Sequence, residues 1–192
     1  MGVEMSNGLI EAYFEDLKKS LSKIDLVEAT HSVKHVIHQI TQKKRIFIAG
    51  NGGSSSIASH MANDFTKGLH AIGAPTTLVF CLNDNYPTIS AIANDINFES
   101  IFRLQLEMFA EPGDSVILIS GSGNSKNVLE AADYAIANQI SVIGITGYDG
   151  GKLNEIANYR FHVPVNDMQI AEDLMSSFGH LVYKDFQKKI NE

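Results

Sequence analysis

The chain has 192 residues, 44% of them hydrophobic, and a formal net charge of −7 at pH 7, which is enough for one domain with a sizeable core. An acidic chain without a basic stripe is poorly suited to binding nucleic acid directly, and a single cysteine, Cys81, excludes both a disulfide framework and a thiolate zinc site. No secretion signal and no apolar run of about 18 residues is found, so we expect a cytoplasmic protein without membrane contact.

Two amphipathic helices are predicted before the first strand. Apolar residues recur at spacings of three, four and seven over residues 8–24 and again over residues 26–42, with charged residues between them. Two helices are more than the start of a sheet needs. The pair therefore either covers the sheet or packs against another subunit.

Residues 45–69 predict a strand, a glycine-rich turn and a helix in one run. Residues 45–49 are apolar, as in a strand buried on both faces of a parallel sheet. The glycines of residues 50–53 permit positive φ, and the serines at 54–56 offer hydroxyls and a helix N-cap. Because backbone N–H groups and the helix dipole point at such a turn, it is a candidate anion site.

This turn differs from two common phosphate-binding motifs. No Lys-Ser or Lys-Thr pair follows the glycines, which argues against a P-loop. Ser55 stands where a dinucleotide-binding motif has its third glycine. The turn suits a single phosphate group, and a capped helix without any ligand is the alternative.

The rest of the chain alternates between strand and helix patterns. Strands are expected at residues 76–81, 115–119, 140–146 and 160–163, and helices at 87–93, 98–109, 128–136, 153–157 and 168–190. Alternation of this kind predicts an α/β fold with three layers, in which helices cover both faces of an open parallel five-stranded sheet. Ligands of such sheets bind beyond the carboxyl ends of the strands.

A second hydroxyl-rich turn, SGSGNS at residues 120–125, follows the third strand. Ser120, Ser122 and Ser125 can offer three hydroxyls and helix N-terminal N–H groups to a phosphate without any lysine. Turns after the first and third strands converge on one crevice. The repetition favours a shared phosphate site over two unrelated capped turns.

Four side chains are candidates for a metal site. His60 and Asp64 are four residues apart on one predicted helix and share a face, which is a possible start for zinc, although such a pair is more often a surface hydrogen bond. Glu172 and His180 are eight residues apart on the last helix, about 12 Å along its axis. Both could reach one ion only from opposite sides.

Three motifs resemble the sugar isomerase (SIS) domain and specifically its phosphoheptose isomerase branch. They are AGNGGSSSIASH at 49–60, SGSGNS at 120–125 and ITGYDGGKL at 145–153. The resemblance extends over nearly the whole chain and implies a flavodoxin-like single SIS domain over 1–192, with a helical pair at 1–43 and an α/β core at 44–192. It also implies a homotetramer with sites at subunit interfaces, which isomerises sedoheptulose 7-phosphate to D-glycero-D-manno-heptose 7-phosphate for lipopolysaccharide or capsule heptose biosynthesis.

The resemblance assigns roles to particular residues. It implies that the phosphate is held by the serines of 120–125 and that Asp95 touches the sugar; the full set of candidate binding residues is Asn51, Gly52, Ser54, Asp95, Ser120, Gly121, Ser122 and Ser125. It also implies one zinc ion per site, held by His60, Asp64, Glu172 and His180.

The metal positions depart from the branch, which has Glu where this chain has Asp64, Gln where it has Glu172, and a further His near Met175. The catalytic candidates are therefore Asp64, Glu172 and His180. We expect Asp64 to bind the metal, Glu172 to bind it or act as the base, and His180 to act as the partner acid.

Two classes of function fit these features. The first is a metal-assisted isomerase, in which a carboxylate removes the proton next to a sugar carbonyl and an enediol forms. The second is a non-enzymatic SIS relative, either an adaptor in replication initiation or a sensor of sugar phosphates. Two histidines facing one crevice favour the enzyme.

Overall fold

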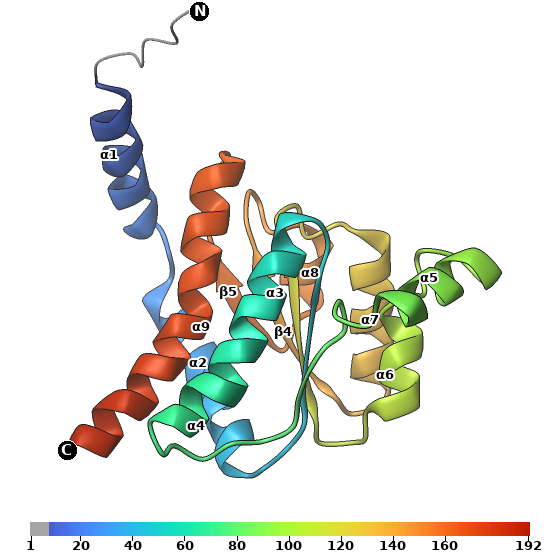
Figure 1. Ribbon diagram of the computed structural model, residues 1–192. Coiled ribbons are helices and arrows are strands. Elements are labelled where there is room, and N and C mark those ends of the chain that lie inside the picture. Colours follow the sequence, from blue (N-terminus) through green and yellow to red (C-terminus); the bar gives the residue numbers. More distant parts are fainter. Residues whose placement is uncertain (1–7) are drawn as a thin grey trace, which may run out of the picture.

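A computed structural model describes residues 8–192 and shows a parallel sheet between two layers of helices (Figure 1). The strands are β1 (Ile46–Gly50), β2 (Val79–Cys81), β3 (Ser115–Ser120), β4 (Ser141–Thr146) and β5 (Tyr159–His162). Their order is β2-β1-β3-β4-β5, and every neighbouring pair is parallel. The predicted three-layer α/β fold is confirmed. Residues 1–7 of the predicted N-terminal helical pair lie outside the described residues.

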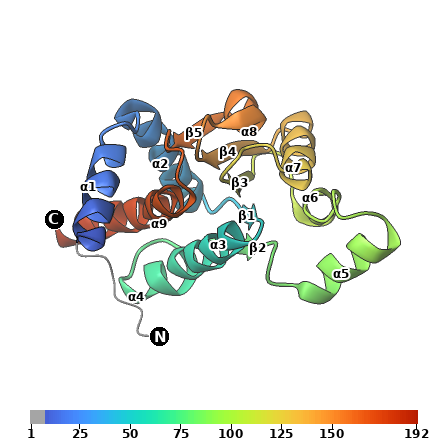
Figure 2. The ribbon, with the colours of Figure 1, turned by 90° about the horizontal axis from the view of Figure 1, so that it is seen from above.

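The helices fall into two groups on either side of the sheet (Figure 2). On one side lie α1 (Leu9–Leu21), α2 (Leu26–Thr41), α3 (Gly53–Asn63), the π-helical turn η1 (Asp64–Gly68), α4 (Leu69–Ala71) and α9 (Met168–Asn191). On the other side lie α5 (Tyr86–Asp95), α6 (Arg103–Phe109), α7 (Lys126–Ala137) and α8 (Gly151–Ile156). Within residues 8–192, none of these helices combines the length and apolar character needed to cross a membrane.

The inner strands are buried on both faces, which explains their continuous apolar sequences. Successive side chains of a strand point to opposite faces. In β1, Ile46 and Ile48 join the core cluster beneath α2, α3 and α9, whereas Phe47 and Ala49 join the cluster beneath α6 and α7. All four side chains are fully buried.

Several predicted boundaries were wrong by a few residues. Strand β2 begins at Val79 rather than at residue 76, and as an edge strand it pairs only with β1. Helix α5 continues to Asp95, where an interruption was expected. Helix α6 begins at Arg103 rather than at residue 98, because the Asn97 side chain accepts the Ser100 N–H at 2.8 Å and favours a turn there.

The predicted serine cap of the helix after β1 was also wrong. Gly52, with φ +52°, precedes the first turn of α3, and no side chain caps this helix end. The serines at 54–56 therefore lie inside the first turn, and Ser55 Oγ donates to the Gly52 carbonyl at 2.7 Å.

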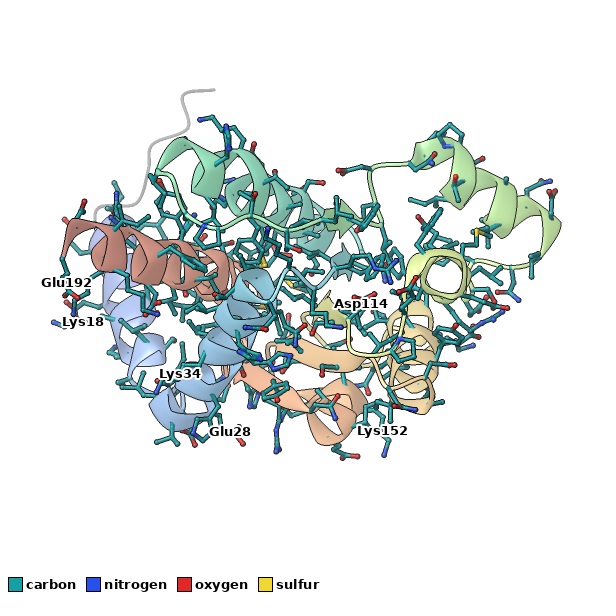
Figure 3. All side chains as sticks on the ribbon, turned by 90° about the horizontal axis from the view of Figure 1, so that it is seen from below. Lys18, Glu28, Lys34, Asp114, Lys152 and Glu192 are labelled. Atoms are coloured by element: carbon teal, nitrogen blue, oxygen red, sulfur yellow. The ribbon has the colours of Figure 1, made fainter. Side chains whose placement is uncertain are left out.

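A buried carboxylate holds the starts of β1 and β3 together. Asp114 is 3% exposed and lies near the middle of the molecule in Figure 3, whereas Lys18, Lys152 and Glu192 lie at its edge. It accepts hydrogen bonds from Arg45 N (3.1 Å), Arg45 Nε (2.8 Å) and Glu111 N (2.8 Å). Bonds to an ionised carboxylate are among the stronger ones in proteins. They help to align two strands whose opposite ends carry the hydroxyl-rich turns.

Candidate functional site

The turns after β1 and β3 line one hollow, which we name the loop pocket. Gly50 of β1 is paired with Ile119 of β3, so the two strands end at the same level of the sheet. The loop pocket has a volume of about 310 Å³. It is lined by Asn51, Gly52, Gly53, Ser54, Ile119, Ser120, Gly121, Ser122, Ser125, Met168 and Glu172. All the predicted phosphate-site residues except Asp95 are therefore brought together.

A pair of side-chain amides joins the two turns. Asn51 Nδ2 donates to Asn127 Oδ1 at 2.8 Å, and Asn127 Nδ2 donates to Asn51 Oδ1 at 2.9 Å. Asn127 lies in the first turn of α7, is 2% exposed, and also accepts the Val128 N–H. The amide of Asn51 is thus held by the second turn, and this pair sets the spacing between the two turns.

The N-terminus of α7 offers hydroxyls and a positive dipole end to the loop pocket. Ser125 precedes the helix and makes no side-chain cap bond, and its hydroxyl lies 3.3 Å from that of Ser120. No acidic residue lies in the first turn of α7. A helix end of this kind, lined by hydroxyls, is suited to binding an anion.

Glu172 lies in the loop pocket and is the only ionisable residue among the described residues that line it. Its carboxylate rests against the first turn of α3, because a Cβ atom placed on Gly53 would lie 2.5 Å from Glu172 Oε1. Glycine at position 53 therefore leaves space for the carboxylate. The positive end of the α3 dipole stabilises a negative charge at this place.

His60, Asp64 and His180 form a second group, which we name the His–Asp cluster. One ligand atom from each lies within 4.8 Å of the others. The His60 Nε2 and His180 Nε2 atoms are 3.0 Å apart, and Asp64 Oδ2 lies 3.5 Å from the first and 3.7 Å from the second. Tetrahedral zinc with bonds of 2.0–2.1 Å places its ligand atoms about 3.3 Å apart. The three donors therefore fit a zinc ion with one coordination position left open.

Close packing of α3 against α9 brings the two histidines together. A Cβ atom on Gly179 would lie 3.0 Å from Met61 Cγ, so glycine permits the helices to approach at this level. His60 and His180 are the neighbours of these two residues in sequence. Asp64 begins the π-helical turn η1, a feature that is frequent at functional sites.

Two predicted residues lie apart from their expected partners. Glu172 is not in the His–Asp cluster, because the eight residues between it and His180 correspond to about 12 Å of helix. Asp95 does not line the loop pocket. It lies at the end of α5, which stands away from the body of the molecule, and it is exposed and accepts a hydrogen bond from Asn94 Nδ2 at 2.8 Å (Figures 1 and 2).

A larger hollow of about 700 Å³, which we name the outer pocket, opens beside the loop pocket and was not predicted. It is lined by Ser122, Asn124, Tyr148, Asp149, Pro164, Asn166 and Met168. Ser122 and Met168 line both hollows. Met168 could have been found from sequence, because it lies four residues before Glu172 on one helix face. Nothing in the sequence distinguishes Asn127 from a surface asparagine.

The loops around the outer pocket are fitted closely together. Gly123 has φ +64°, and a Cβ atom there would overlap the Gly150 carbonyl oxygen. Asn124 donates to the Ser122 carbonyl at 2.9 Å and accepts the Lys152 N–H at 3.0 Å. The turn after β3 is thus held against the turn after β4.

A family model described as "SIS domain" matches residues 12–147. Among similar proteins, the phosphoheptose isomerase of Fusobacterium nucleatum is 30% identical over 184 residues, which is 94% of each chain. The phosphoheptose isomerase of Helicobacter pylori is 35% identical over 179 residues, covering 89% of this chain and 88% of that one.

Among solved structures, a phosphoheptose isomerase from Francisella tularensis superposes with a TM-score of 0.87. It is 22% identical in sequence, and the match covers 96% of this chain and all of that one. At this identity the likeness supports the fold.

Proposed function

This chain belongs to the SIS domain family, and we propose that it isomerises sedoheptulose 7-phosphate to D-glycero-D-manno-heptose 7-phosphate. Relatives at 30% and 35% identity are named phosphoheptose isomerase, which makes the chain a phosphosugar isomerase. The observation that carries the proposal is the position of Glu172, which faces two hydroxyl-rich turns across one pocket. We further place this single SIS domain in the cytoplasm, in the synthesis of heptose for lipopolysaccharide or capsule.

The loop pocket provides the groups that such a reaction needs. The phosphate binds to the turn at 120–125 and the N-terminus of α7, with Asn51, Gly52 and Ser54 opposite. Glu172 removes a proton from C1 of the ketose, the C–H electron pair forms the C1–C2 double bond, and the C2 carbonyl oxygen takes up a proton to give the enediol. Return of the proton from Glu172 to C2, with loss of the proton from the C1 hydroxyl, gives the aldose. Water reaches the enediol less readily in a hollow whose walls already hold the phosphate.

We propose that the His–Asp cluster holds one zinc ion. Two imidazoles and one carboxylate are suitable zinc ligands, and their separations of 3.0–3.7 Å match a tetrahedral site. When bound, zinc supplies a Lewis acid that polarises sugar oxygens. Glu172, expected as a fourth ligand, serves in this proposal as the base, while His60, Asp64 and His180 bind the metal. His180, which was expected both to bind the metal and to act as the partner acid, keeps only the metal-binding role in this proposal.

A sensor or adaptor of the same fold would need phosphate contacts without a base. The carboxylate of Glu172 in the loop pocket favours the enzyme, because an acidic group beside a phosphate site weakens anion binding, and a chemical role accounts for its presence there.

We expect binding of the substrate phosphate to depend on the serine hydroxyls. Replacing Ser122 and Ser125 together by alanine removes two hydrogen bonds to a charged group, each contributing about 1.5–3 kcal/mol, and should weaken binding by about two to four powers of ten. Calorimetry with sedoheptulose 7-phosphate measures this. Ser141→Ala, at the opposite end of the sheet, should bind like the unchanged protein. Unchanged affinity in the double variant would exclude these serines from the site.

Glu172→Gln should lower kcat by at least about 10²-fold, because losing a general base typically has an effect of this size. The amide fills the same space, leaves the phosphate contacts in place and removes a negative charge near the phosphate, so ligand affinity should not fall. Asp173→Asn is a matched control, since Asp173 accepts the Tyr13 hydroxyl at 2.6 Å and does not line the loop pocket. NMR detection of the aldose product gives the rate. Full activity in Glu172→Gln would assign the base elsewhere.

The zinc content of the protein should depend on the side chains of the His–Asp cluster. Purified protein is expected to hold about one zinc ion per chain, and His60→Ala or His180→Ala should lose it, because two remaining ligands bind zinc weakly. Asp64→Asn should lower zinc affinity and retain the fold. His70→Ala, on α4, should keep the metal. Elemental analysis and thermal unfolding separate metal loss from unfolding, and equal zinc content in all four variants would contradict this assignment.

A homotetramer with sites at subunit interfaces is also part of the proposal. Leu9, Ile10, Phe14, Leu26 and Val27 are each more than half exposed along α1 and the start of α2, and apolar stripes of this size commonly pack against a partner. We expect a tetramer by sedimentation at micromolar concentration. A monomer with full turnover would contradict shared sites.

A further inference from the structure

The outer pocket has walls of a particular chemical composition. Among the described residues that line it are a phenol, a carboxylate and two side-chain amides, and no lysine, arginine or histidine. Asp149 Oδ1 accepts the Gly151 N–H at 3.2 Å, which leaves Oδ2 able to accept another hydrogen bond. A carboxylate without a basic neighbour disfavours an anionic ligand. These groups suit a neutral ligand that carries several hydroxyls.

Tyr148 stands in this wall with an unusual backbone conformation. Its φ is +46°, which is rare for a bulky residue and costs energy unless the surroundings hold it. Its N–H donates to the Val165 carbonyl at 3.1 Å, and its carbonyl accepts from the His162 ring at 3.1 Å. The surrounding bonds therefore keep the Tyr148 side chain directed at the outer pocket.

The outer pocket continues into the loop pocket over Gly121. A Cβ atom on Gly121 would lie 3.4 Å from Met168 Sδ and 3.8 Å from Tyr148 Cε2. Gly121 lines the loop pocket, Tyr148 lines the outer pocket, and Met168 lines both. A ligand whose phosphate lies on the turn at 120–125 can therefore reach the side chains of the outer pocket across this glycine.

We propose that the outer pocket is a subsite for the middle hydroxyls of a long-chain sugar phosphate, and that Tyr148 and Asp149 select for chain length. The inference rests on the proposed isomerase function. With the phosphate on the 120–125 turn and C1 at Glu172, the middle carbons of a seven-carbon chain lie along the open side of the loop pocket, beside Ser122 and Met168. Their hydroxyls then hydrogen-bond to the Tyr148 hydroxyl and to the Asp149 carboxylate. A five-carbon chain has fewer hydroxyls at this place.

The test uses a double variant with a matched control. Tyr148→Phe with Asp149→Asn removes the phenol hydroxyl and the negative charge, and it keeps the ring and the acceptor for the Gly151 N–H. The control is Tyr134→Phe with Asp133→Asn, an adjacent pair on α7 that lines neither hollow. Calorimetry then gives the dissociation constants of sedoheptulose 7-phosphate, ribulose 5-phosphate and inorganic phosphate. Thermal unfolding checks that both variants fold.

We expect the double variant to bind sedoheptulose 7-phosphate about ten- to a hundredfold more weakly, because a neutral and a charge-assisted hydrogen bond are lost. Binding of ribulose 5-phosphate should weaken by less than about threefold, and the affinity for inorganic phosphate should not change. The same fold-change for both sugar phosphates, or none for either, would overturn the subsite.

A separate outcome concerns the proposed function. If the unchanged protein binds sedoheptulose 7-phosphate with this dependence on Tyr148 and Asp149 but forms no aldose, the isomerase proposal fails and the subsite stands. If turnover of sedoheptulose 7-phosphate is observed and its KM is equal in the double variant and the control, the subsite fails and the isomerase stands.

Discussion

The double hydrogen bond between Asn51 and Asn127 is the contact on which the arrangement of the loop pocket depends. It joins two turns that are 76 residues apart in sequence, with amide separations of 2.8 and 2.9 Å. Because Asn127 is 2% exposed, water cannot readily replace either bond, and an unpaired amide there would be costly. The pair thus keeps the serines of one turn opposite the glycines of the other. Because β1 and β3 are parallel and end at the same level of the sheet, the two turns lie near each other, and the amide pair sets the separation between them.

The seam between α3 and α9 connects the loop pocket to the His–Asp cluster. At one end, Gly53 leaves room for the Glu172 carboxylate; further along, Gly179 leaves room for Met61. His60 from α3 and His180 from α9 then come into contact. Glycine inside a helix lowers its stability by about 0.5–1 kcal/mol relative to alanine. At Gly179 the close approach that results brings the imidazole nitrogens of His60 and His180 to 3.0 Å, and this explains glycine in the middle of a long helix.

Much of the fold could be predicted, since buried parallel strands and amphipathic helices have different apolar periods. The order of strands and helices was confirmed along the chain. The errors lie where a side chain competes with the local pattern, as at Asn97, whose side-chain oxygen Oδ1 accepts the Ser100 N–H and holds a turn where a helix was expected. The π-helical turn at Asp64 was also missed, because its sequence has ordinary helical spacing.

The sequence by itself determined which residues can serve the site: two hydroxyl-rich turns after parallel strands must meet at one edge, and His60 and Asp64 must share a helix face. Only the tertiary structure decided how these residues are divided between the loop pocket and the His–Asp cluster. It placed Glu172 in the loop pocket rather than with the His–Asp cluster, left Asp95 on the outlying α5, and opened the outer pocket beside Tyr148. The physical reason is that spacing along one element follows from local geometry, whereas the distance between elements depends on close packing at a few positions, such as Gly53, Gly121 and Gly179, that no local pattern reveals.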